Sequence, residues 1–181
     1  MALSFSFDDV EPSHYKVIAP LLEQFDVRGT FFFFAGLLEN ESIEGYKKAL
    51  AHGHELGNHT FEHVKLKDCS PEQVQYQVGR GHDAIRGIFG VEATAFCHTH
   101  NRTNRMIDQY VFAQYDISRI VAKVPTNRFY NDIRSYTPMD LMDSMFKKVL
   151  KKKGWWHVAG HGMNGSGWEP VSQKFLGEVL R

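Results

Sequence analysis

The sequence is short of cysteine, of excess charge of either sign and of long apolar runs, and each shortage excludes a class of protein. Two of the 181 residues are cysteines, Cys69 and Cys97. They form no CxxC pair, which argues against a thiolate zinc site or a disulfide framework. Lys plus Arg and Asp plus Glu each number 21, for a formal net charge of +0. We therefore expect no broad attraction to nucleic acid or to an anionic membrane.

The chain also lacks segments that would direct it into or across a membrane. Residues Met1–Phe7 have neither the basic start nor the long apolar centre of a signal peptide. The longest aromatic run, Phe31–Phe34, is far too short to span a bilayer. The sequence as written therefore predicts a soluble, cytoplasmic protein with no membrane partner, unless a leader segment has been removed.

What the sequence has in unusual number is histidine, with ten residues. Histidine is the commonest metal ligand in proteins and a frequent proton-transfer group. The chain is long enough for one domain of ordinary size, which we place over residues 1–181. Hydrophobic residues make up 43% and charged residues 23%, which is typical of a folded globular chain and excludes bulk disorder.

Apolar, strand-like runs alternate with helical patterns along the chain. Strands are expected at Leu3–Phe7, Thr30–Phe34, Glu55–Asn58, Ala93–Cys97, Ile117–Val121 and Trp155–Ala159. Helices are expected at Val17–Phe25, Ser42–His52 with Ser42 as its cap, Pro71–Ile88 after the capping Ser70, Arg105–Gln114, Thr137–Gly154 and Val171–Leu180. The segment Lys123–Tyr136 has no clear periodicity and predicts a loop over the functional site.

Repeated strand–helix units imply a parallel sheet with helical crossovers. Six such units in one short domain favour a closed or partly closed β/α barrel, with an open doubly wound sheet as the alternative. In either fold, ligands bind at the carboxyl ends of the strands.

Three polar clusters follow expected strands, at the ends where a ligand would bind. Asp8 and Asp9 are adjacent carboxylates, which are costly to bury together without a cation or base, although a turn or helix cap would also explain them. His59 and His63 are spaced to share one face of a helical turn and bind one metal, although such a pair is often incidental. His161 lies between two glycines. Two imidazoles and one carboxylate make a three-ligand zinc set with an open position for water, and the second carboxylate is then available as a base.

These clusters stand in a pattern that resembles the polysaccharide deacetylase (NodB-like) family. Ser6–Asp9 resembles the TFDD motif of that family, His59–His63 its H[ST]xxH motif, Gly29–Phe32 its GTFF strand and Gly53–His59 its GHE[LI]GNH stretch. His161 occupies the place of the late catalytic histidine. The resemblance extends over most of the chain, from about Leu3 to Leu180.

The resemblance implies a distorted, incompletely closed (β/α)7 barrel and the metal-dependent hydrolysis of an N-acetyl or related acyl group on a carbohydrate. Asp9, His59 and His63 would then bind one divalent ion, zinc first, with cobalt, nickel or manganese also accepted by such a site. Asp8 would be the general base and His161 the general acid. Two alternatives remain: an amidohydrolase of the same fold that acts on a small non-sugar amide, and a catalytically silent carbohydrate-binding relative.

The segment Phe96–Arg102 departs from the family pattern. Cys97 stands where the family commonly has an arginine that orients the base. His100 stands at the family's tyrosine position, whose backbone N–H would serve the oxyanion. His98 and His100 are candidates for substrate contacts or additional metal ligands.

Other positions are candidates to complete the site. Arg119 is the first candidate to replace the missing arginine and Arg102 is the second. Trp168 is a candidate to stack on a sugar ring, and the family's Asp-x-x-Asp-Trp motif, which tunes the late histidine, is not visible. Many relatives have a further strand after the last helix, so the barrel edge is expected to be open or to be covered in a homo-oligomer.

Overall fold

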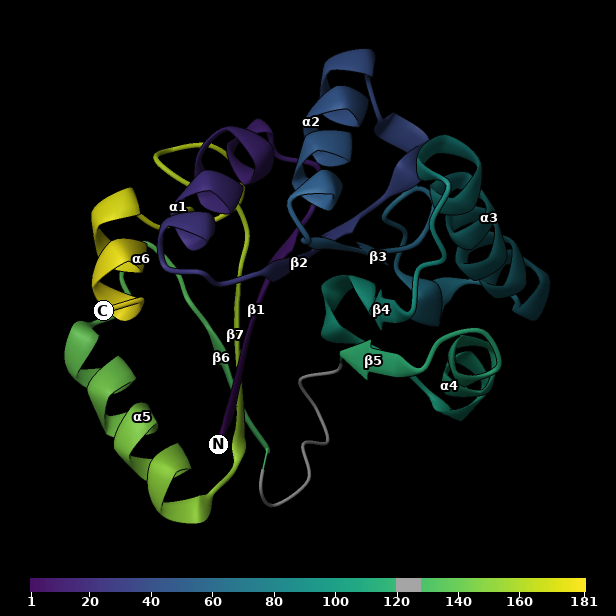
Figure 1. The fold of residues 1–181 in the computed structure, drawn as a ribbon. Coiled ribbons are helices and arrows are strands. Elements are labelled where there is room, and N and C mark those ends of the chain that lie inside the picture. Colours follow the sequence, from purple (N-terminus) through teal and green to yellow (C-terminus); the bar gives the residue numbers. More distant parts are fainter. Residues whose placement is uncertain (120–127) are drawn as a thin grey trace.

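The computed structural model describes residues 1–119 and 128–181, and its centre is one sheet of seven parallel strands (Figure 1). The strands are β1 (Ala2–Asp8), β2 (Gly29–Phe33), β3 (Glu55–Asn58), β4 (Ala95–Cys97), β5 (Ile117–Arg119), β6 (Arg128–Asp132) and β7 (Trp155–Gly160). Their order across the sheet is β5-β4-β3-β2-β1-β7-β6, so that β5 and β6 are its two edges. Because the sheet curves without these edges pairing in the described ranges, the expected incompletely closed (β/α)7 barrel is confirmed.

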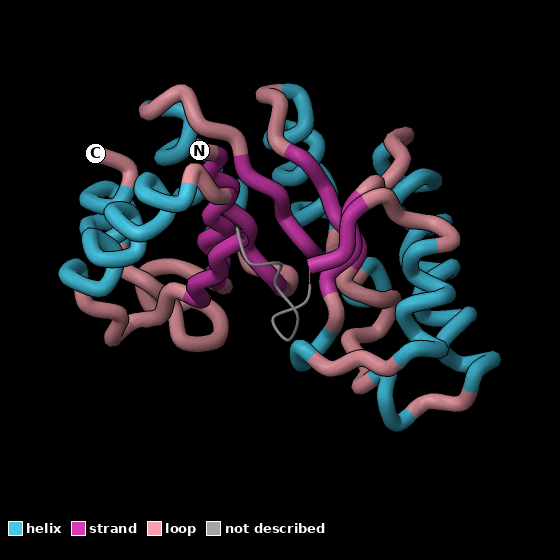
Figure 2. The backbone as a smooth tube through the Cα atoms, turned by 90° about the horizontal axis from the view of Figure 1, so that it is seen from below, coloured by secondary structure: helices cyan, strands magenta, loops and turns pink. Residues whose placement is uncertain are grey.

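Helices connect the strands and lie on the outer side of the curved sheet (Figure 2). They are α1 (Ala19–Gln24), α2 (Asn40–Ala51), α3 (Pro71–Phe89), α4 (Arg105–Phe112), α5 (Met139–Lys152) and α6 (Gln173–Val179). A π-helical turn, His14–Ile18, leads into α1, and short 3-10 turns occur at Ala35–Leu37, Leu66–Asp68 and Thr99–Asn101. Within the described ranges, every helix is too short or too polar to cross a lipid bilayer.

Helix α3 begins with the capping chemistry that its sequence predicts. Ser70 accepts a hydrogen bond from the backbone N–H of Gln73, whose side chain accepts one from the N–H of Ser70, so α3 begins with the expected capping box. The cap predicted at Ser42 is wrong. Glu39 is the last extended residue before α2, so the helix begins at Asn40 and Ser42 lies within its first turn.

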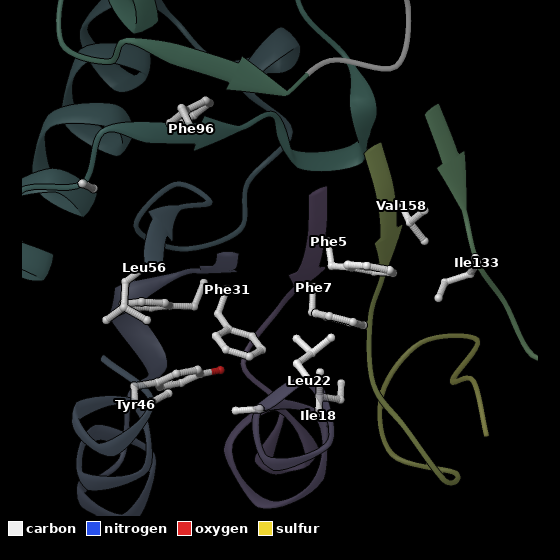
Figure 3. Packing of buried hydrophobic residues seen from close by; sticks show 14 of the residues in the cluster. Phe5, Phe7, Ile18, Leu22, Phe31, Tyr46, Leu56, Phe96, Ile133 and Val158 are labelled. Carbon is white, nitrogen blue, oxygen red and sulfur yellow. The ribbon is translucent and has the colours of Figure 1, made fainter. Parts of the chain in front are cut away.

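The main core lies between the outer face of the sheet and the helices. Successive side chains of a strand point to opposite faces, so Phe5 and Phe7 of β1 face the helices while Ser6 and Asp8 face the barrel interior. Figure 3 shows these phenylalanines packing with apolar side chains from neighbouring elements, and the full cluster includes Phe31, Leu22, Tyr46 and Val158. This packing fixes the strands in place, so their carboxyl ends hold the polar residues that follow them in defined positions.

The barrel interior is more polar than the outer core. Its buried apolar cluster consists only of Phe32, Ala95 and Cys97 among the described residues. Beside it, the Ser6 hydroxyl and Nε2 of His157 lie 2.8 Å apart, and Nε1 of Trp155 donates to the Ser4 hydroxyl at 2.9 Å. Side chains with polar atoms therefore reach the interior from both β1 and β7.

The loop predicted at Lys123–Tyr136 is wrong for the residues of β6. Arg128–Asp132 pairs in parallel with β7, from Arg128 opposite Trp155 to Asp132 opposite Ala159. No residue of β6 is fully buried, and polar side chains occur on both of its faces, so the strand carries no hydrophobic alternation by which to recognise it. Residues 120–127, which include the end of the strand expected at Ile117–Val121, lie outside the described residues.

Candidate active site

The carboxylate of Asp9 and the imidazoles of His59 and His63 meet where β1 and β3 end. Oδ1 of Asp9 lies 3.2 Å from Nε2 of His63 and 3.8 Å from Nε2 of His59. One ligand atom from each of the three residues lies within 4.8 Å of the others. Asp9 has a left-handed backbone with φ of 75°, which turns the chain directly after β1. The fold thus brings together the three residues that the resemblance assigns to a metal.

The His59 ring is held in one tautomer. Its Nδ1 donates to the carbonyl oxygen of Cys97 at 2.8 Å, so the lone pair is on Nε2, the nitrogen that faces Asp9. Burial lowers the pKa of His59 to about 4, even though the charges of Asp8 and Asp9 act to raise it. The imidazole is therefore neutral at pH 7, which is the form that binds a metal.

The donor set fits a divalent cation. Oδ1 of Asp9 is buried and makes no hydrogen bond to any described residue. Burial acts to raise the pKa of Asp9. The contact with His63 and the charges of His59 and His161 outweigh burial and lower the pKa to about 2. A buried, charged oxygen without a hydrogen bond, facing two imidazole nitrogens, is costly unless a cation compensates it. A His2Asp set accepts zinc, cobalt, nickel or manganese.

The two histidines come from a loop, not from a helical turn as their spacing predicted. Residues 59–65 contain no helix, and both Thr60 (φ 69°) and His63 (φ 56°) have left-handed backbone. The ring centroids of His59 and His63 are nonetheless 5.0 Å apart. The two rings are therefore close, as expected, but a loop with left-handed residues brings them together and not a helical turn.

Asp8 lies beside this set and is held from the other edge of the interior. Nη2 of Arg119, at the end of β5, donates to Oδ2 of Asp8, and both side chains are almost fully buried. Nη1 of Arg119 donates to the Tyr130 hydroxyl at 2.7 Å. Burial raises the pKa of Asp8, but the charges of Arg119, His59 and His161 outweigh it and hold the pKa below its usual range. Asp8 is therefore an ionised carboxylate with a fixed orientation.

Cys97 occupies the position next to this ion pair. Its thiol lies 3.6 Å from Oδ2 of Asp8 and 2.6 Å from Nη2 of Arg119. Asp8, His59 and Cys97 form a second group whose ligand atoms lie within 4.8 Å of one another. This group shares His59 with the first one, and the Arg119 guanidinium already compensates its carboxylate. A cation is therefore better placed at Asp9.

His161 faces Asp8 from the loop after β7. Its Nε2 lies 4.0 Å from Oδ2 of Asp8, and its Nδ1 lies 3.9 Å from Oδ1 of Asp132 at the end of β6. The rings of His161 and Trp168 pack edge to face, with their centroids 4.7 Å apart. Trp168 is half exposed, and the guanidinium of Arg134 lies 4.7 Å from its ring centroid.

Asp132 is a site residue that the sequence reasoning missed. Burial raises the pKa of its carboxyl, against the charges of His161 and Arg134. Oδ1 of Asp132, which faces His161, has no hydrogen-bond partner among the described residues. Asp132 lies in the segment that the sequence predicted to be a loop, where β6 shows no hydrophobic alternation, so no local pattern marked it as the end of a strand.

The remaining candidates occupy different places. His100 is exposed, and its ring centroid lies 5.0 Å from that of His63, so it is at the rim of the group formed by Asp9, His59 and His63. His98 is buried, with Nε2 3.6 Å from Oδ1 of Asp108 in α4, and it belongs to neither group of ligand atoms. Arg102 is exposed, and its guanidinium takes part in none of the ion pairs among the described residues.

The fold is an open α/β barrel, and a His2Asp group lies at the carboxyl ends of its strands. These two features define the class of the protein: an α/β barrel with a candidate metal centre. Residues 2–117 match the model of the family described as polysaccharide deacetylase. Because this match covers more than half of the chain, the protein belongs to the polysaccharide deacetylase family, as the resemblance implied.

Similar proteins agree with this assignment. The chain is 30% identical over 90 residues to a chitooligosaccharide deacetylase of Azorhizobium caulinodans, in an alignment that covers 49% of this chain and 42% of the relative. The matched part thus spans less than half of that relative. The structure is similar to a carbohydrate esterase domain of a xylanase from the hindgut metagenome of Trinervitermes trinervoides, with a TM-score of 0.70, 16% identity and coverage of 99% and 78% of the two chains.

A second solved structure shows that this fold alone does not establish catalysis. It is a pseudoenzyme of carbohydrate esterase family 4 from Bacillus anthracis, with a TM-score of 0.68, 16% identity and coverage of 99% of this chain and 59% of that one. At such identities the likeness concerns the fold. The activity of this chain must therefore be argued from its own site residues.

Proposed function

We propose that the protein is a divalent-metal-dependent hydrolase that removes an N-acetyl or related acyl group from a carbohydrate. One observation carries this proposal: the ligand group Asp9, His59 and His63 lies beside a buried ionised carboxylate, Asp8, which faces an imidazole, His161. A base, an acid and a cation site close together are the groups that amide hydrolysis requires.

Asp9, His59 and His63 would hold the ion. When bound, it supplies Lewis-acid polarisation of the acyl oxygen and a lowered pKa for water. The residues themselves contribute an anionic oxygen and, at His59, a nitrogen lone pair oriented by the Cys97 carbonyl. The His59 ring is thereby oriented before any substrate arrives, because its hydrogen bond to the Cys97 carbonyl holds it.

Asp8 is the general base. Its Oδ1 makes no hydrogen bond to a described residue, whereas its Oδ2 is engaged by Arg119, so one oxygen remains available for the proton of an attacking water. Arg119 is a positioning residue, because it acts on the reaction through the carboxylate that it orients and keeps ionised.

His161 is the general acid. As water adds to the acyl carbon, the new C–O bond forms and the C–N bond breaks, and Nε2 of His161 gives its proton to the departing nitrogen. The proton taken by Asp8 and the one given by His161 balance, so the net reaction is the addition of water across the C–N bond. Asp132 lies against the other ring nitrogen and orients the imidazole, as carboxylates do for catalytic histidines.

A carbohydrate is the favoured substrate because the similar protein named above deacetylates chitooligosaccharides and because Trp168 offers a half-exposed ring beside His161. An amidohydrolase acting on a small non-sugar amide is the second candidate. It is favoured by the altered segment after β4, where His100 takes a left-handed backbone at the rim of the site.

The test is an acetate-release screen with zinc, cobalt, nickel or manganese added. The substrates are chitooligosaccharides, peptidoglycan fragments, acetylated monosaccharides and small amides. We expect release from the sugars by the wild type, and a loss of about 100- to 10,000-fold in Asp8→Asn with metal still bound. Release from small amides alone would select the second candidate. A chain that binds metal but hydrolyses none of these substrates would be a silent relative.

A further inference from the structure

His14 connects helix α2 to the backbone of the proposed acid, His161. It is the first residue of the π-helical turn after β1 and is fully buried. Its Nδ1 lies 2.9 Å from the hydroxyl of Tyr46 in α2, and its Nε2 lies 3.1 Å from the backbone carbonyl oxygen of His161. The ring also stacks on Phe31 of β2, with centroids 5.2 Å apart.

The direction of both hydrogen bonds follows from chemistry. Burial lowers the pKa of His14 to about 4, so the ring is neutral at pH 7 and carries one proton. The His161 carbonyl can only accept, so the proton is on Nε2 of His14. Nδ1 must then accept from Tyr46, whose hydroxyl stays protonated because burial raises its pKa. Figure 3 shows Tyr46 extending from α2 toward Phe31, which places its hydroxyl on the sheet side of the helix.

The residues before His14 hold the same loop. The Ser13 hydroxyl accepts from the backbone N–H of Met163 at 3.1 Å. The Ser166 hydroxyl donates to Oε2 of Glu11 at 2.6 Å. The turn that follows the Asp8–Asp9 pair is thus hydrogen-bonded at three points to the loop that begins at His161. This arrangement fixes the distance between the segment of the base and the segment of the acid.

We propose that His14, oriented by Tyr46, is a positioning residue that holds the His161 backbone so that its side chain faces Asp8. This proposal rests on the proposed function for its effect on turnover, because His161 acts there as the acid. A buried histidine that served only the core would pack equally well without a bond to that particular carbonyl. The three bonds between the two segments favour the positioning role.

The first test compares two substitutions at position 14 with a matched control. His14→Phe keeps the stacking on Phe31 and removes both hydrogen bonds, whereas His14→Gln keeps an amide that can donate to the His161 carbonyl. His54→Phe is the control. His54 is also buried and packs on Phe31, with ring centroids 5.5 Å apart, but it hydrogen-bonds to Gly29 and Glu23.

We expect His14→Phe to lower kcat about 10- to 100-fold with KM changed less than about twofold, since small displacements of a catalytic group cost this much. His14→Gln should recover most of the loss, and His54→Phe should retain kcat within about twofold at a temperature where all variants are folded. Equal kcat in His14→Phe and His54→Phe would overturn the proposal.

The second test needs no substrate, so it separates failure of this inference from failure of the proposed function. In the wild type, imidazole ¹⁵N chemical shifts should show that the proton of His14 is on Nε2. In Tyr46→Phe, the ¹⁵N chemical shift of Nδ1 should change, because Nδ1 loses its hydrogen-bond donor. Amide hydrogen exchange at Met163 should accelerate in His14→Phe but not in His54→Phe. Unchanged Met163 exchange in folded His14→Phe would overturn the positioning role, whether or not the wild type releases acetate.

Discussion

Arg119 donates through its guanidinium to the buried carboxylate of Asp8, although 111 positions separate the two residues in the sequence. Arg119 ends β5 at one edge of the sheet, and Asp8 ends β1, which has a strand on either side, so the pair crosses the barrel interior. Cys97, at the end of β4, lies against both partners. The arginine missing from the segment after β4 thus has a counterpart on the next strand.

Replacing Arg119 should move the acidic limb of the activity profile. The carboxylate of Asp8 must be ionised to act as a base, and Arg119 is the main charge that offsets the raising effect of burial on its pKa. In Arg119→Gln the pKa of Asp8 rises, so activity is lost at a higher pH than in the wild type, and kcat falls by about 10- to 100-fold. Initial rates of acetate release across pH measure both effects. Arg102→Gln, the same change at an exposed arginine, should match the wild type, and an unmoved limb in Arg119→Gln would remove its role.

Metal content should depend on the Asp9 group. We expect His63→Ala to weaken divalent metal binding by more than about 100-fold, because one of three ligands is lost. His52→Ala, at a half-exposed histidine that contacts Glu23, is the control and should bind like the wild type. Elemental analysis after dialysis measures the bound metal. Chelation should abolish acetate release and added zinc should restore it. Equal metal in His63→Ala and wild type would exclude this ligand set.

Asp132→Asn should slow the reaction without releasing the metal. The substitution preserves the size of the side chain and removes the charge that faces Nδ1 of His161. We expect kcat to fall about 10- to 100-fold, since a misoriented acid transfers its proton less efficiently. Asp140→Asn, at an exposed aspartate in the first turn of α5, tests the same chemical change away from the site. If Asp132→Asn turns over like Asp140→Asn, Asp132 does not orient the acid.

The stability of the metal-free protein should decrease as the pH is lowered, because His14 is held neutral in the fold. The pKa of His14 is about 4 in the folded chain and about 6.5 in the unfolded chain. Above pH 6.5 the imidazole is neutral in both states, and its titration takes no stability from the fold. Below that pH the unfolded chain takes up the proton first, and stability is lost progressively down to about pH 4. The contribution is about 3 kcal/mol over that range.

Urea unfolding at pH 7.5 and pH 4.5, with chelator present, measures this loss. His14→Gln has no such titrating group, so its stability should fall by about 2 to 3 kcal/mol less than that of the wild type between the two pH values. An identical loss in both proteins would assign the pH dependence to other groups.

Local sequence was sufficient for most elements and for the residue types of the site. Alternating and helical patterns located six of the seven strands, and the Ser70–Gln73 capping box located the start of α3. The order of the Asp8–Asp9 pair, the His59–His63 pair and His161 was sufficient to indicate the family. Local pattern failed at β6, because that strand is polar and lies at an edge of the sheet.

The sequence by itself determined the alternation of strands and helices and the identity of the ligand-type residues, because these depend on periodicity and side-chain chemistry over short distances. Only the tertiary structure decided that Arg119 meets Asp8, that Asp132 meets His161 and that His14 binds the His161 carbonyl. The first pair joins two strands, the second joins β6 to the loop after β7, and the third joins the turn after β1 to that same loop. Their proximity is set by the order of parallel strands in the curved sheet, which no local pattern encodes.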